Sequence, residues 1–185
     1  MSAARALYRA VAIAFWLSAA AIMLWAGLPD RARYTGVLRA DGLRVAPEVG
    51  ALAPPFRAST LDGDFTLTTP PLQRIVLNFW ATWCIPCAVE MPELQRLHET
   101  DPEVRVVGVN LGESPEQVAA WAVAYKITFP LALDTDGQIA RLYALRGQPT
   151  TTIIAPSGII HAIFYGATDE ASLRRSLAAL DRTQP

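Results

Sequence analysis

Long apolar stretches alternate with polar ones along this chain, and their lengths predict the order of its elements. The longest, residues 10–28, contains no charged residue and is long enough for a helix that crosses a bilayer core of about 30 Å. Ile75–Trp80 and Val104–Val109 are shorter and mostly apolar, which is typical of strands covered on both faces. The pattern therefore predicts one membrane-length helix followed by a domain with buried strands.

Turn residues and helical spacing predict the other elements of that domain. Two hairpins are expected, Phe56–Leu61 with Phe65–Leu67 across Asp62-Gly63, and Thr150–Ala155 with Ile159–Phe164 across Pro156-Ser157-Gly158. Helices are expected at Glu90–Glu99, from Pro115 onward, at Gln138–Leu145 and at Ala171–Leu180, with a short strand at Phe129–Leu133. Ser114 and Gln117 have the spacing of a capping box. Strands separated by helices and followed by a hairpin and a helix predict an α/β domain with a mixed central sheet.

The apolar N-terminal stretch divides the chain into four predicted parts. These are a cytoplasmic tail (1–9), a transmembrane anchor (10–28), a linker (29–48) and a folded domain (49–185). The linker carries a turn signal at Asp41-Gly42 and a proline that breaks helices. A short tail is the simpler part to leave in the cytoplasm, so the domain is expected on the extracytoplasmic side of the membrane.

Two features around this stretch leave alternatives open. Basic residues flank it on both sides and partly offset one another under the positive-inside rule: Arg5 and Arg9 before it, and Arg31, Arg33 and Arg39 after it. Ala19 and Ala21 fit a loose cleavage pattern for a signal peptide. The apolar run continues beyond them through Ile22–Trp25, however, and this favours an uncleaved anchor.

Size and charge narrow the range of functions. With 185 residues, the chain has room for one domain of ordinary size and an appendage. Its net charge is −1, its pI is about 6.1, and its arginines are scattered rather than clustered. No nucleic-acid partner is therefore expected.

Cys84 and Cys87 are the only cysteines of the chain, and they follow the buried strand predicted at Ile75–Trp80. A spacing of two residues allows one thiol to lie at a helix N-terminus, exposed, and the other to lie one turn further along, shielded. The backbone N–H groups and the dipole at that helix end stabilise a thiolate. Cys84 is therefore expected to attack a partner disulfide, and Cys87 to resolve the mixed disulfide that results.

Other uses of the cysteine pair fit the sequence less well. A zinc site normally needs four ligands, and His98 and His161 stand alone. Haem attachment needs a histidine directly after the second cysteine, where the chain has Ala88. A purely structural disulfide that closes so short a loop would restrict the unfolded chain only slightly. No metal or cofactor is expected. The chain has no Gly-x-Gly fingerprint for binding a dinucleotide. Electrons are therefore expected from the thiols of another protein, a membrane-embedded reductant.

The segment Leu77–Cys87, followed by Glu90 and Pro92, resembles the TlpA/ResA family of extracytoplasmic thiol–disulfide oxidoreductases. The resemblance covers roughly residues 49–180 and includes Val107–Ser114, Phe129–Asp134 and Gln148–Thr151. It implies a thioredoxin-like fold with an extra N-terminal hairpin and an insert around the third helix. It also implies reduction of disulfides in exported proteins, notably the cysteine pair of apocytochromes c.

The resemblance also assigns roles around the two cysteines. The implied tuning and substrate-binding residues are Trp83, Pro86, Glu90, Gln148, Pro149 and Thr150. Pro149 matches a cis-proline that lies against the disulfide and leaves backbone exposed for a substrate strand. Glu90 matches an acidic residue that tunes the pair, although an ordinary first-turn helix acid would also occur there. Trp83 is expected to cover the disulfide. Asn78 stands where thioredoxins proper carry a buried aspartate, and the TlpA/ResA group commonly has asparagine there.

Three functions compete with the predicted protein-disulfide reductase. The stretch Ala53–Phe56 also resembles peroxiredoxins, but the threonine and proline that precede their nucleophile are replaced here by Ala81 and Leu77. An oxidase that introduces disulfides would use the same cysteine motif and remains an alternative. A binding module or metallochaperone would use the fold only as a scaffold, and the intact cysteine pair without further ligands argues against it.

Overall fold

The computed structural model describes residues 13, 16, 18, 37–38 and 42–183. The chain divides into two units, residues 1–35 and 36–185. The predicted tail lies outside the described residues, and so does the predicted anchor apart from Ile13, Trp16 and Ser18, which are helical. Within the part of the chain that is described, we find no helix with both the length and the apolar character needed to cross a membrane.

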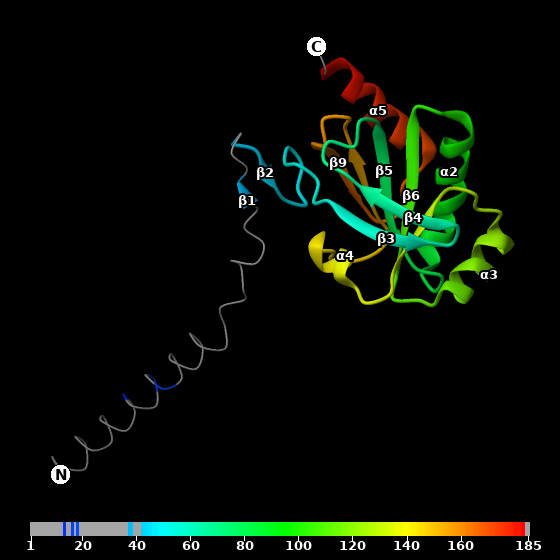
Figure 1. The fold of residues 1–185 in the computed structure, drawn as a ribbon, viewed down its shortest axis with the longest axis horizontal. Coiled ribbons are helices and arrows are strands. Elements are labelled where there is room, and N and C mark those ends of the chain that lie inside the picture. The colour runs from blue at the N-terminus through cyan, green and yellow to red at the C-terminus, as the bar shows by residue number, and fades with distance from the viewer. Residues whose placement is uncertain (1–12, 14–15, 17, 19–36, 39–41, 184–185) are drawn as a thin grey trace, which may run out of the picture. The chain divides into compact units, whose positions relative to one another are not determined.

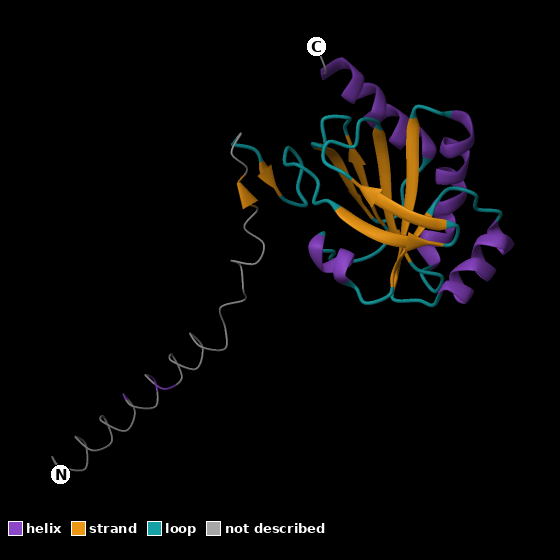
Figure 2. Cartoon of the chain, viewed as in Figure 1, coloured by secondary structure: helices purple, strands orange, loops and turns teal. Residues whose placement is uncertain are grey.

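A mixed seven-stranded sheet forms the centre of the second unit (Figures 1 and 2). In spatial order its strands are β4 (Gly63–Leu67), β3 (Phe56–Thr60), β7 (Leu131–Asp134), β6 (Val104–Leu111), β5 (Arg74–Trp80), β8 (Thr150–Ile154) and β9 (Ile160–Tyr165). The central strands β5, β6 and β7 are parallel to one another, whereas the remaining pairs are antiparallel. The mixed sheet predicted from the sequence is thus confirmed, and the two most apolar strands lie inside it.

The side chains of β5 alternate between two hydrophobic cores, one on each face of the sheet. Val76 and Trp80 lie in a core with residues of α2 (Ile85–Thr100), α3 (Pro115–Tyr125) and α5 (Glu170–Thr183). Ile75, Leu77 and Phe79 lie in the other core, which includes residues of the β3–β4 hairpin and of α4 (Gln138–Leu142). Burial on both faces explains why this strand reads as an almost continuous apolar run.

The predicted start of α3 is confirmed, α5 extends slightly beyond its predicted range, and the bounds of α2 and α4 differ more. Ser114 and Gln117 form the expected capping box at the start of α3. Helix α2 begins five residues before the predicted Glu90, because Cys84 serves as its N-cap and Pro86 is tolerated in a first turn. Helix α4 ends earlier than predicted, since Ala144 adopts a left-handed conformation with φ of 47° that cannot continue a helix.

A second short hairpin precedes the main sheet. Strand β1 (Val37–Leu38) pairs antiparallel with β2 (Arg44–Val45), inside the range predicted as a linker. Leu52, in the segment between β2 and β3, forms an isolated β-bridge with Ile159 and is only 2% exposed. This segment is therefore packed into the domain.

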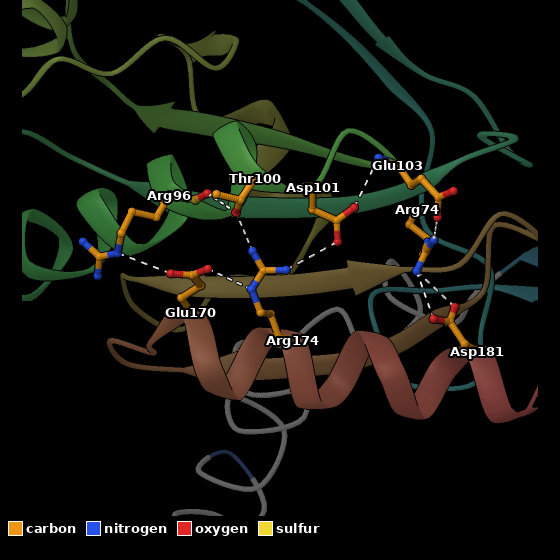
Figure 3. A network of polar contacts seen from close by, with 8 residues as sticks. All are labelled: Arg74, Arg96, Thr100, Asp101, Glu103, Glu170, Arg174 and Asp181. Carbon is orange, nitrogen blue, oxygen red and sulfur yellow. Dashed lines mark hydrogen bonds and ion pairs between the residues drawn. The ribbon is translucent and has the colours of Figure 1, made fainter.

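Ion pairs join α5 to α2, the helix that carries the cysteines (Figure 3). Glu170 binds Arg174 at 2.8 Å and Arg96 of α2 at 3.3 Å, and Arg174 also reaches Thr100 and Asp101 at the end of α2. Partly exposed pairs of this kind contribute at most about 1 kcal/mol each. Their main role is to fix the position of α5 relative to α2 on one face of the sheet.

Candidate active site

Cys84 and Cys87 form a disulfide at the N-terminus of α2. Strand β5 leads into this helix through a short turn, so the central strand of the sheet determines where the pair lies. The backbone N–H of Cys87 donates a hydrogen bond to Cys84 Sγ at 3.2 Å. When the disulfide is reduced, the same N–H and the helix dipole favour a thiolate on Cys84.

The accessibility of the two sulfurs is unequal but lower than the sequence suggests. Cys87 is fully buried, whereas Cys84 keeps 5% of its surface exposed. Cys84 is therefore the residue that a partner can reach, through a narrow opening rather than as a freely exposed thiol. The low exposure of Cys84 could not be predicted from the sequence, because it depends on how the rest of the domain packs around the helix end.

Apolar side chains surround this opening. Trp83, Ile85 and Val89 are 66%, 81% and 66% exposed, and Pro86 is exposed as well. Trp83 thus has most of its surface in solvent, although it was expected to cover the disulfide. An exposed apolar rim around a reactive sulfur suits contact with another polypeptide.

Glu113 holds the turn that leads into the cysteine pair. Its carboxylate accepts hydrogen bonds from Thr82 N at 2.7 Å, from Asn110 Nδ2 at 2.7 Å and from Thr82 Oγ1. The side chain is only 8% exposed, so these bonds are shielded from water. The sequence analysis did not single out Glu113. The feature that could have identified it is an acidic residue two positions after β6, because β6 runs parallel to β5 and both strands end at the same edge of the sheet.

Glu90 forms a second buried polar cluster, one helical turn beyond Cys87. Asn78 Nδ2 donates to Glu90 Oε2 at 3.1 Å, and Thr151 Oγ1 donates to Glu90 Oε1 at 2.7 Å. Asn78 Nδ2 also donates to Thr151 Oγ1 at 2.8 Å, which closes the cluster. Burial raises the pKa of Glu90 from 4.5 to about 7, although these hydrogen bonds oppose the shift. Glu90 can therefore gain or lose a proton near neutral pH, three positions after Cys87 on α2.

A pocket lies at the start of β8, the strand that pairs with β5. It has a volume of about 320 Å³, and we call it the Pro149 pocket; it is lined by Arg146, Gly147, Gln148, Pro149, Thr150, Tyr165 and Gly166. Thr150 pairs with Phe79, so Pro149 lies level with the end of β5, where the turn toward Cys84 begins. The Gln148–Pro149 peptide bond is cis, in agreement with the resemblance.

The structure thus gathers the residues singled out from the sequence at one edge of the sheet. Trp83 lies in the turn after β5. The start of α2 carries the two cysteines, Pro86 and Glu90, and the start of β8 carries Gln148–Thr150. Arg146 and Tyr165 of the Pro149 pocket were not singled out from the sequence. The signal was weak, since a lone arginine in a loop and a tyrosine at a strand end are common surface residues.

The chain has neither the threonine nor the proline that peroxiredoxins carry before their nucleophile. Leu77 and Ala81 are both fully buried apolar residues, and Leu77 packs in the core of the sheet. A threonine hydroxyl near the attacking sulfur and the associated proline are therefore missing at these positions, as the sequence indicated.

Comparison with known proteins places this site in a family. The sequence profile of the AhpC/TSA family matches residues 49–163. The chain is 32% identical over 140 residues to the thiol-disulfide oxidoreductase ResA of Geobacillus thermodenitrificans (strain NG80-2), covering 74% of this chain and 80% of ResA. It is 36% identical over 138 residues to the thioredoxin-like protein YneN of Bacillus subtilis (strain 168), covering 72% and 81%.

A solved structure agrees with these sequence matches. The crystal structure of StoA from Bacillus subtilis superposes with a TM-score of 0.59 at 30% sequence identity, covering 67% of this chain and 96% of StoA. Together with the disulfide at a helix N-terminus and the mixed sheet, these matches define the family. The chain belongs to the thioredoxin-like AhpC/TSA family and is similar there to thiol-disulfide oxidoreductases of the ResA type.

Proposed function

We propose that this thiol–disulfide oxidoreductase works as a reductase of disulfides in exported proteins, such as the cysteine pair of an apocytochrome c. The observation that carries the proposal is the Cys84–Cys87 disulfide, with one slightly accessible and one buried sulfur at the start of α2. Similarity to the thiol-disulfide oxidoreductase ResA supports thiol–disulfide exchange as the chemistry.

The reaction proceeds by two exchanges of thiolate and disulfide. The Cys84 thiolate attacks one sulfur of the client disulfide, a mixed disulfide forms, and the other client sulfur leaves as a thiolate and takes up a proton. Cys87 then loses its proton and attacks Cys84 Sγ, which releases the second client sulfur. The client gains two electrons, and the enzyme ends in the disulfide form described above.

We assign the handling of the Cys87 proton to Glu90. The two residues are three positions apart on α2 and both are buried, so water has little access to the thiol of reduced Cys87. With its pKa raised to about 7 by burial, Glu90 can accept a proton at neutral pH and return it.

The Pro149 pocket and the exposed rim around Cys84 are the surfaces proposed for the client. An extended client segment would lie along Gln148, Pro149 and Thr150, and Trp83 and Pro86 would contact it from the helix side. The oxidised enzyme then needs two electrons, and we assign their supply to a membrane-embedded protein with a thiol pair.

The N-terminal segment is proposed to anchor the enzyme in a membrane. Residues 10–28 are uncharged, and the described residues Ile13 and Trp16 are helical with exposed side chains. Such a helix would hold the domain on the extracytoplasmic face, close to the proposed reductant and away from nucleic acid.

Anchoring predicts that the full-length protein sediments with membranes and resists extraction at high pH. Protease added to spheroplasts should digest the domain, whereas a variant without residues 1–28 should remain unsedimented after lysis. A mature protein whose mass shows cleavage near Ala21, or a domain protected from the added protease, would contradict this arrangement.

The direction of electron flow is tested by the reduction potential of the Cys84–Cys87 pair. We expect the full-length protein in detergent, equilibrated in dithiothreitol or glutathione buffers, to show a potential near or below about −270 mV, the value for thioredoxin. Alkylation of free thiols followed by mass measurement gives the reduced fraction, and a variant with both Cys84→Ser and Cys87→Ser is the control for non-specific alkylation. A potential near about −120 mV, as for DsbA, would instead make the chain an oxidase that introduces disulfides.

A further inference from the structure

The Pro149 pocket contains one feature that the exchange reaction does not use. Arg146 is the only charged residue among those lining the pocket. Its side chain is exposed, and it takes part in no hydrogen bond or ion pair with another residue of the described range 42–183. Most other arginines of the domain have a partner there, for example Arg57 with Asp64 and Arg74 with Asp181.

The pocket also has an aromatic lining residue. Tyr165 pairs with Thr150 across the β8–β9 ladder and is 71% exposed. The backbone between these side chains is formed by Gly147, Gln148 and Pro149. The pocket therefore presents a cation and an aromatic ring beside the segment that the resemblance identifies as a substrate track.

The start of β8 links the pocket to the strand that leads to the cysteines. Thr150 pairs with Phe79 of β5, and β5 continues through Trp80 into the turn that ends at Cys84. A client segment bound covalently at Cys84 would thus extend its neighbouring residues toward this pocket. Because consecutive residues of an extended segment are about 3.3 Å apart, only residues close to the client cysteine can reach it.

We propose that Arg146 is a specificity residue, which selects clients with an acidic side chain within a few residues of the reacting cysteine. The proposal rests on the proposed reductase function and names the chemistry of its client. Its basis is charge complementarity: an unpaired guanidinium at the border of a binding pocket attracts a carboxylate and repels a cation. Tyr165 supplies apolar contact to the same segment whatever its charge.

The expected size of the effect follows from the exposure of Arg146. Exposed ion pairs are weak, so an acidic residue should raise kcat/KM about 3- to 5-fold over a neutral one, and a basic residue should lower it by a similar factor. Salt should reduce both effects, because the Debye length falls to about 3 Å at 1 M.

The test measures reduction of a set of peptides by the full-length, pre-reduced protein. Each peptide carries one disulfide and differs only in a Glu, Gln or Lys at one position, from three residues before to three after the reacting cysteine. The quantity compared is the ratio of kcat/KM for the Glu and Lys peptides. Variants are Arg146→Glu, Tyr165→Ala, and Arg182→Glu, which makes the same charge change at an exposed residue of α5.

We expect the native protein and Arg182→Glu to prefer Glu at one position, and Arg146→Glu to prefer Lys there. Tyr165→Ala should lower the rate for all peptides and keep the ratio. An equal ratio in Arg146→Glu and the native protein, or no preference at any position, would overturn the role of Arg146 while leaving the reductase intact. Reduction of no peptide at all would overturn both proposals. Rates that fall as enzyme concentration rises would show that a second copy fills the pocket, which also overturns client selection.

Discussion

Replacing Cys87 with serine is expected to leave client proteins covalently attached to Cys84. The first exchange needs only the Cys84 thiolate, whereas release needs the second sulfur to attack the mixed disulfide. The structure assigns these roles through burial, since Cys87 is fully enclosed and Cys84 keeps a small accessible surface. Mass spectrometry of the variant mixed with a disulfide peptide should show one adduct per chain, cleaved by dithiothreitol.

The complementary variant Cys84→Ser should show no such adduct and should lose catalysed reduction by at least about 1000-fold, because it lacks the attacking nucleophile. Serine is close to cysteine in size, so both variants should fold, and the thermal unfolding of each can be compared with that of the reduced native protein. An adduct of equal yield in Cys84→Ser would contradict the assignment and make Cys87 the attacking residue.

Glu90 should make the oxidised protein less stable as pH rises from acid to neutral. Its pKa is raised by burial from 4.5 to about 7 in the folded state. Between these two values the folded protein holds a proton on Glu90 that the unfolded chain has released. The stabilising contribution is therefore complete below pH 4.5 and is lost as pH rises through 7. The loss amounts to about 3 kcal/mol of unfolding free energy, from about 1.4 kcal/mol per pKa unit.

The measurement is urea unfolding from pH 4 to pH 8 with the disulfide intact, comparing the native protein with Glu90→Gln. Glutamine does not titrate, so the fall in unfolding free energy between pH 4.5 and 7 should be smaller in the variant by about the same 3 kcal/mol. Its amide also places a donor among the donors of Asn78 and Thr151, at a cost that does not depend on pH. The slope with pH is thus more informative than the absolute stability.

Glu116→Gln is a matched control for this experiment. Glu116 is exposed at the start of α3, and its pKa is lowered, first by a hydrogen bond with Ser114. Its contribution is present above pH 4.5 and is lost as pH falls below that value, so the slope between pH 4.5 and 7 should not change. Identical slopes in Glu90→Gln and the native protein would mean that Glu90 titrates in its ordinary range.

Local patterns in the sequence were sufficient for most of the fold. The apolar run of β5 and the capping box at Ser114 depend on residues close together in the chain, so their physical cause is visible in the sequence. The Cys84–Cys87 pair belongs to the same class, because its chemistry needs only a spacing of two residues and a helix start. The range predicted for α2 began too late, at Glu90, although Cys84 was expected at a helix start, and the structure confirms Cys84 as the N-cap of α2.

The tertiary structure alone decided the electrostatics and accessibility of the site. Glu90 meets Thr151, 61 positions away, and Thr82 meets Glu113, 31 positions away, because the sheet order places β6 and β8 on either side of β5. Enclosure between these elements raises the pKa of one carboxyl and leaves Cys84 only a narrow opening. The sequence determined which groups react, since that depends on residue type and local spacing. Burial and long-range contact exist only once the sheet has formed, and they decide how those groups are tuned and what can reach them.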